Sequence, residues 1–155
     1  MRDFLLRFLA DYLIIPIVLV GAVVLLRVPK KQRYQIWARA VVAGLSALLF
    51  AKIISLFYQG QRPFEALGLQ PGASFLPNPG FPSDHTLLVF TITFIVWAST
   101  KNKRLSATLL VLSTLVAVGR VLALVHTPAD VIGGIVCAFL GVACVYGRNF
   151  FTTRP

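Results

Sequence analysis

The sequence predicts an all-α, polytopic membrane bundle of about five transmembrane helices. Of its 155 residues, 57% are hydrophobic and only 13% are charged, whereas soluble domains average about 45–50% and about 25%. A chain of this size has too little interior to hide that much apolar surface from water. Several apolar stretches are also about as long as the hydrocarbon core of a bilayer requires. Lipid is therefore the expected solvent for most of the chain.

Five windows of about 20 mostly apolar residues are candidate spans. They are Phe4–Leu26, Gln35–Tyr58, Ser83–Thr100, Leu105–Val125 and Ala129–Gly147. The first follows basic residues, as a signal peptide would, but it is long and no small-residue cleavage site precedes Arg27, so we expect a retained helix. No tract between the windows is long enough for a second domain. We expect residues 1–155 to form one integral membrane domain.

The net charge of +10 has a topological explanation. With an odd number of spans, three connecting or terminal segments share one side of the membrane, and they carry nine of the fifteen basic residues. These are Arg27, Lys30, Lys31, Arg33, Lys101, Lys103, Arg104, Arg148 and Arg154. The positive-inside rule assigns them, with the carboxyl terminus, to the cytoplasm. Because the cations mark topology and anionic lipid, we expect no nucleic-acid partner.

Ionisable residues also gather at the opposite, outer ends of the spans. They are Lys52, Arg62, Asp84, His85, Arg120, His126 and Asp130, and they include both histidines of the chain. Ionisable groups at membrane depth are costly and usually functional. A long connection, Gln59–Pro82, lies on the same side, and connections of this length are typically functional or disordered. The sequence therefore predicts an active site at the outer membrane interface.

Each of these residues also has a purely structural interpretation. Ser83 follows a proline and opens an apolar run, which is typical of a helix N-cap. The run Thr127-Pro128-Ala129-Asp130 reads as a capping box with proline at the first helical position. A single histidine at a helix end is commonly an interfacial residue, and Lys52 could extend its ammonium to the membrane surface. The functional interpretation depends on all of these residues lying close together at one site in the folded chain.

Together these residues describe an anion site. Arg62, Arg120 and Lys52 supply positive charge, and the helix starts at Ser83 and near Pro128 supply unpaired backbone N–H groups. Two imidazoles provide a nucleophile and a proton donor, and an acid four residues after a histidine is placed to orient its ring. Three nearby cations would repel a divalent ion, and the sequence has neither an HExxH motif nor two cysteines at metal-ligand spacing. We therefore expect no metal and no cofactor.

Three sequence blocks carry a family resemblance. They are Arg62-Pro63, then Pro82-Ser83-Asp84-His85, then Gly119-Arg120 followed after five residues by His126 and after three more by Asp130. In this order they resemble the type 2 phosphatidic acid phosphatase superfamily, which shares its site with bacterial acid phosphatases and vanadium haloperoxidases. The resemblance covers about residues 50–135, the expected catalytic core.

The departures from the family pattern are informative. The family lysine lies seven residues before the arginine, where this chain has Ser55; the nearest lysine, Lys52, lies about one turn further back. Asp84 replaces a glycine and Gly119 replaces a serine. The form with Asp84, together with Arg62-Pro63-Phe64, is most similar to the branch that dephosphorylates undecaprenyl pyrophosphate. Five spans instead of six imply that a peripheral helix is missing.

The resemblance implies a membrane lipid phosphatase of the bacterial inner membrane, with its site facing the periplasm or exterior. His126 would attack the terminal phosphorus of undecaprenyl pyrophosphate, Asp130 would orient it, and His85 would protonate the leaving group. Arg62, Arg120, Ser83 and Lys52 would hold phosphate oxygens. Phosphatidylglycerol phosphate, phosphatidic acid and lipid A phosphate are alternative substrates. A phospholipid transporter without catalytic activity is the alternative from a different class of protein.

Overall fold

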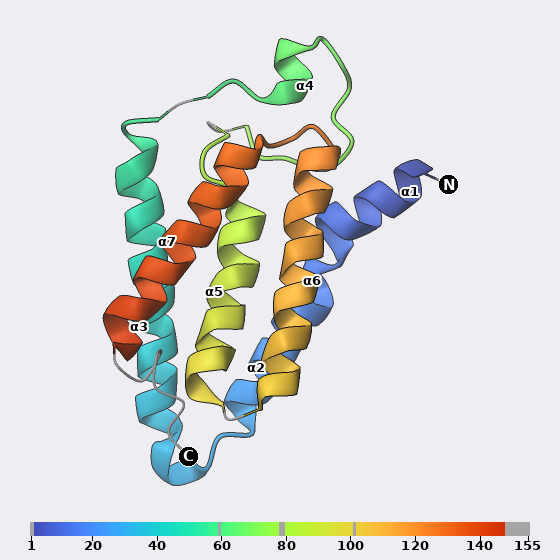
Figure 1. Cartoon of the computed structure of the whole chain (residues 1–155). Helices are drawn as coiled ribbons and strands as arrows, with labels where there is room; N and C mark the ends of the chain where they lie inside the picture. The colour runs from blue at the N-terminus through green and yellow to red at the C-terminus, as the bar shows by residue number, and fades with distance from the viewer. Residues whose placement is uncertain (1, 59, 78–79, 101, 148–155) are drawn as a thin grey trace.

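The computed structural model describes residues 2–58, 60–77, 80–100 and 102–147, and all regular structure in these ranges is helical. The chain folds back and forth as a bundle (Figure 1). The elements in order are α1 (Arg2–Arg7), the π-helix η1 (Phe8–Tyr12), α2 (Ile14–Leu26), α3 (Lys30–Ser55), the short α4 (Pro63–Ala66), α5 (Asp84–Ser99), α6 (Lys103–Leu122) and α7 (Pro128–Tyr146).

Four helical stretches are long and apolar enough to cross a membrane. They are Phe4–Leu26, which joins α1, η1 and α2, together with α3, α6 and α7. Their bounds follow the predicted windows closely, although α3 begins and ends a few residues earlier than predicted. These helices confirm the prediction of a polytopic, all-α membrane protein.

The fifth predicted span, Ser83–Thr100, is α5, whose 16 residues are fewer than the other four spans have. Its position explains the difference, because α5 lies inside the bundle and contacts α2, α3, α6 and α7 (Figure 1). A helix surrounded by protein need not match the lipid thickness, and it can also carry polar side chains. Thr93, for example, is buried and shares a 2.8 Å hydrogen bond with Ser113 of α6.

Small residues let α3 and α7 pack closely. Buried alanines recur along one side of α3, at Ala40, Ala43, Ala47 and Ala51. A Cβ atom placed on Gly141 of α7 would overlap the backbone N and Cα of Ala47. Close backbone approach through small residues is the usual way in which helices associate in lipid, where no hydrophobic force drives them together.

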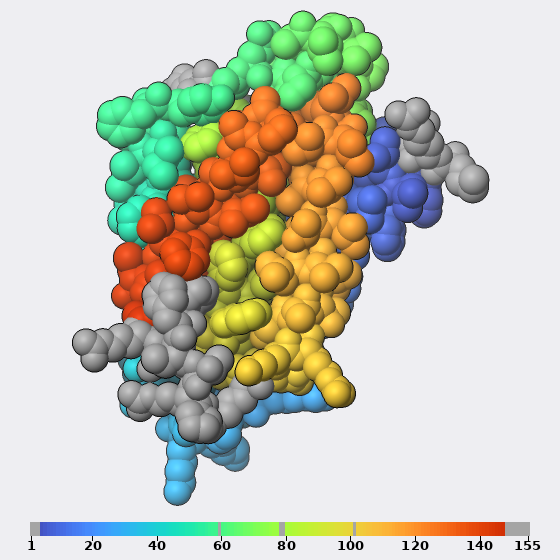
Figure 2. All heavy atoms as spheres, viewed as in Figure 1, coloured from blue at the N-terminus to red at the C-terminus, as the bar shows by residue number. Residues whose placement is uncertain are grey.

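The two ends of the bundle differ: one carries many basic residues, and the other is covered by a loop segment. The end with the α2–α3 and α5–α6 connections carries Arg27, Lys30, Lys31, Arg33, Lys103 and Arg104; the predicted cytoplasmic residues Lys101, Arg148 and Arg154 lie outside the described residues. The starts of α5 and α7 and the end of α6 meet at the opposite end. There, residues 60–77 cover the bundle (Figure 2). This covered end contains the predicted site.

Candidate active site

A cavity of about 110 Å³ lies at the covered end of the bundle. Its walls come from the covering segment, the start of α5, the end of α6 and the turn between α6 and α7. The lining residues are Arg62, Ser74, Phe75, Leu76, Asp84, His85, Arg120 and His126. The structure therefore brings together both histidines and two of the three cations that the sequence analysis selected.

The turn between α6 and α7 is held in place by the covering segment. Leu124 in this turn has a left-handed backbone, with φ of 59°, so the chain reverses sharply after α6. Three hydrogen bonds fix the turn, from Phe64 N to Leu124 O (3.0 Å), from Gly72 N to Ala123 O (3.0 Å) and from Arg62 Nη1 to Val125 O (2.7 Å). His126 follows directly and is thereby placed beside Arg62.

Arg62 is a buried cation that also organises the cavity wall. Its side chain is 4% exposed, its Nη2 donates to Leu76 O at 3.1 Å, and its guanidinium lies 5.3 Å from the centre of the Phe75 ring. Burial lowers the pKa of Arg62 from its ordinary value, and the negative charges of Glu65, Asp130 and Asp84 oppose that shift. An arginine tolerates such a shift without losing its proton. The cavity therefore keeps a fixed positive charge here.

His126 and Asp130 form the central pair of the site. His126 Nδ1 is buried and lies 3.7 Å from Asp130 Oδ2, a distance too long for a hydrogen bond but short enough for charge attraction. The same Oδ2 accepts a hydrogen bond from Thr127 N at 2.7 Å, and Thr127 Oγ1 accepts one from Asp130 N at 3.2 Å. The capping box is thus confirmed, and it holds the carboxylate beside the histidine. Because Nδ1 faces Asp130, Nε2 is the nitrogen available for chemistry.

The surroundings of His126 favour its neutral form. Burial lowers the pKa of His126 below its ordinary value, and Arg120 and Arg62 lower it further, whereas Asp130 opposes the shift. A neutral imidazole has the lone pair that nucleophilic attack requires. The electrostatics of the cavity therefore suit a histidine nucleophile at neutral pH.

The lowered pKa of His126 predicts the acid limb of the pH profile of kcat/KM. If neutral His126 is required, activity falls as pH drops through its lowered pKa, so the acid midpoint of kcat/KM should lie below the ordinary histidine value of about 6.5. The measurement is kcat/KM from pH 4 to pH 9, corrected for substrate ionisation determined separately by ³¹P NMR. An acid midpoint clearly above 6.5 would contradict the assignment.

Arg120 has a partner that the sequence analysis did not select. Its guanidinium is 1% exposed, and Nη1 lies 2.8 Å from Oδ1 of Asp11 in η1. Asp11 is an ionisable residue inside the predicted span Phe4–Leu26, and the cost of such residues in lipid is the signal that would have identified it. Among the acids, only Asp130 was predicted to have a catalytic role; the structure adds the carboxylate of Asp11 beside the cavity, which Asp84 also lines.

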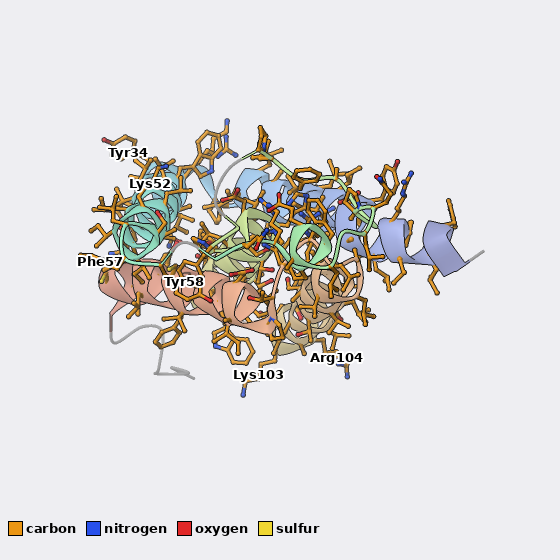
Figure 3. The ribbon with its side chains drawn as sticks, turned by 90° about the horizontal axis from the view of Figure 1, so that it is seen from above. Tyr34, Lys52, Phe57, Tyr58, Lys103 and Arg104 are labelled. Atoms are coloured by element: carbon orange, nitrogen blue, oxygen red, sulfur yellow. The ribbon has the colours of Figure 1, made fainter. Side chains whose placement is uncertain are left out.

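Two predicted phosphate ligands do not line the cavity. Ser83 is fully buried and acts as the N-cap of α5, accepting hydrogen bonds from Thr86 N (3.5 Å) and Thr86 Oγ1 (3.1 Å). Lys52 is exposed and lies at the α3 edge of the bundle (Figure 3). Ser55, at the position of the family lysine, donates a hydrogen bond to Lys52 O at 2.8 Å. The phosphate-binding roles of Ser83 and Lys52 stay predictions.

The fold and the cavity together define a class of protein, namely a helical membrane protein with a cavity lined by two histidines and two arginines at one end of its bundle. Comparison with known proteins narrows this class. A family model described as the PAP2 superfamily matches residues 35–153. The chain belongs to the PAP2 superfamily. The match includes every residue of the predicted site.

Two curated proteins are similar to the chain in sequence. The chain is 35% identical to the bacitracin transport permease protein BcrC of Bacillus licheniformis, over 87% of this chain and 64% of that protein. It is 26% identical to the undecaprenyl-diphosphatase BcrC of Bacillus subtilis, over 96% of this chain and 73% of that protein. The chain thus spans less than two thirds of the first relative's length. No solved structure matches the chain significantly.

Proposed function

We propose that this protein is a membrane lipid phosphatase that removes the terminal phosphate of undecaprenyl pyrophosphate. The observation that carries the proposal is the cavity in which His85, His126, Arg62 and Arg120 meet, with Asp130 behind His126. Membership of the PAP2 superfamily supports the reaction class. The name of the Bacillus subtilis relative, an undecaprenyl-diphosphatase, supports the substrate.

In the first step, Nε2 of neutral His126 attacks the terminal phosphorus and forms a P–N bond. The bond between that phosphorus and the bridging oxygen breaks, and His85 gives its proton to the departing lipid phosphate. Arg62 and Arg120 balance the negative charge on the phosphoryl oxygens during the transfer. Asp130 stabilises the positive charge that develops on His126.

In the second step, water hydrolyses the phosphohistidine. His85, now neutral, accepts a proton from the attacking water, and the P–N bond breaks to release inorganic phosphate. His126 returns to its neutral form and His85 is again protonated, so the cycle closes. None of these steps requires a metal or another cofactor.

The dimensions of the site favour a phosphate headgroup whose lipid tail stays outside the cavity. Pockets that enclose a whole drug-sized ligand have volumes of about 300–1,000 Å³, well above the 110 Å³ found here. The long hydrocarbon chain would lie among the apolar helices while the phosphate enters the cavity. We propose that this end of the bundle faces the periplasm or cell exterior, because the opposite end carries the basic connections.

The test is phosphate release from a panel of lipids by the purified full chain with a chelator present. The panel contains undecaprenyl pyrophosphate, phosphatidylglycerol phosphate, phosphatidic acid and lipid A phosphate. We expect the highest kcat/KM for undecaprenyl pyrophosphate and no loss in chelator. A faster rate on another lipid would reject the substrate. Lipid movement between leaflets without phosphate release would favour a transporter, as the Bacillus licheniformis name suggests for that relative.

A further inference from the structure

We propose that Asp11 is a positioning residue for the phosphate site, and that it sets both the orientation of Arg120 and the place of the cavity wall that begins at Ser74. This inference rests on the proposed function and extends it to the first transmembrane segment. Asp11 does not line the cavity. It would act through the residues that do.

The first contact is the ion pair between Asp11 and Arg120. Arg120 is almost fully buried, so its charge needs a partner, and Asp11 Oδ1 at 2.8 Å supplies one. The contact holds Arg120 by Nη1. Among the described residues, buried Nε of Arg120 has no hydrogen-bond partner. The ion pair therefore fixes the orientation of the guanidinium, and Arg120 itself is one of the residues that line the cavity.

The second contact joins Asp11 to the covering segment. Asp11 Oδ2 accepts a hydrogen bond from Ser74 N at 3.0 Å. Ser74 and the two residues after it line the cavity. One carboxylate thus connects Arg120 of α6 and the loop wall, using a separate oxygen for each. Loss of this carboxylate would release both cavity elements together.

A glycine in α6 lets Asp11 come this close. A Cβ atom on Gly119 would lie 2.9 Å from Ala10 N and 3.0 Å from Leu9 C. Both are backbone atoms of the first transmembrane segment, so they cannot move aside as a side chain could. The replacement of the family serine by Gly119 therefore permits the contact between η1 and α6. Asp11 can reach Arg120 only because residue 119 has no side chain, so we refer to Asp11 and Gly119 together as the Asp11–Gly119 unit.

A purely electrostatic role for Asp11 makes the opposite prediction. Removing a carboxylate from the edge of an anion site makes the site more positive, which by itself strengthens the binding of phosphate analogues. If Asp11 orients Arg120 instead, its removal weakens binding. The sign of the change separates the two roles.

The test is a double-mutant cycle on the full chain, with orthovanadate as the phosphate analogue and calorimetry as the measurement. We expect Asp11→Asn to raise the Kd for orthovanadate roughly tenfold, as coupling between contacting residues typically allows. In an Arg120→Gln background the same substitution should raise Kd by a clearly smaller factor, because only the contact with Ser74 N is then lost. Unchanged or tighter binding by Asp11→Asn overturns the proposal. An equal loss in both backgrounds also overturns it, because the effect would then not pass through Arg120.

Gly119→Ala tests the unit without touching either charge, and it gives a second route if Asp11→Asn does not fold. We expect weaker orthovanadate binding, and little further loss when Asp11→Asn is added. Gly44→Ala is the matched control, because a Cβ atom there meets nothing within 4 Å, and its Kd should equal that of the parent. Parent-like binding by folded Gly119→Ala would contradict the proposed unit.

Orthovanadate binding does not depend on turnover, so this experiment is separable from the proposed function. If the chain fails to hydrolyse undecaprenyl pyrophosphate while the cycle shows coupling, the substrate is wrong and the positioning role stands. If hydrolysis occurs while the cycle shows no coupling, the positioning role is wrong and the proposed function stands.

Discussion

Replacing His126 with alanine should abolish phosphate release from undecaprenyl pyrophosphate. Removal of a catalytic nucleophile typically lowers kcat by roughly 10⁴-fold or more. His126 lines the cavity, its Nδ1 faces Asp130, and its surroundings keep it neutral. The measurement is the release of labelled inorganic phosphate under single-turnover conditions, which reports the chemical step directly.

The loss must be separated from unfolding. His126→Gln keeps a polar side chain of similar size, so it should preserve the fold and the melting temperature while it removes the nucleophile. Gly44→Ala again serves as the matched control, with full activity expected. Substantial phosphate release by a folded His126→Ala or His126→Gln protein would disprove the assignment of the nucleophile.

Replacing His85 with alanine should lower kcat on undecaprenyl pyrophosphate by about 10²–10⁴-fold, the usual contribution of a general acid or base. His85 lies in the first turn of α5 and lines the same cavity as His126. The departing lipid phosphate needs a proton, and the attacking water must lose one, so both steps slow. The measurement is kcat for the lipid substrate.

An aryl phosphate separates the two roles of His85. An activated aryl leaving group departs without a proton, so the first step should survive in His85→Ala. The second step still lacks its base, and the phosphoenzyme should therefore accumulate. Equal losses for the lipid and the aryl substrate, without accumulation, would show that His85 does not act as this acid and base.

Much of the fold was predictable because its helices are encoded locally. Apolar windows of the right length marked the spans, and the serine and threonine caps marked where α5 and α7 begin. The length of α5 was harder to predict, since hydropathy does not reveal that a helix is surrounded by protein. That property depends on contacts with four other helices.

The site was partly predictable for the same reason. The sequence blocks selected both histidines and two arginines that line the cavity, because these residues lie at helix ends and recur in the family pattern. Lys52 was selected by its place at the outer end of a predicted span and by its helical register, and neither fixes where a long side chain points. Asp11 was missed because its partner Arg120 is 109 residues away in sequence, and only the folded chain brings them together.

The most direct test of the account is to trap the phosphoenzyme. His85→Ala would be mixed with an aryl phosphate carrying a ³²P label, quenched rapidly and digested into peptides. The account predicts a protein-bound label that is stable to alkali, labile to acid and located on His126. Label on another residue, or phosphate release with no protein-bound label at any time, would contradict it.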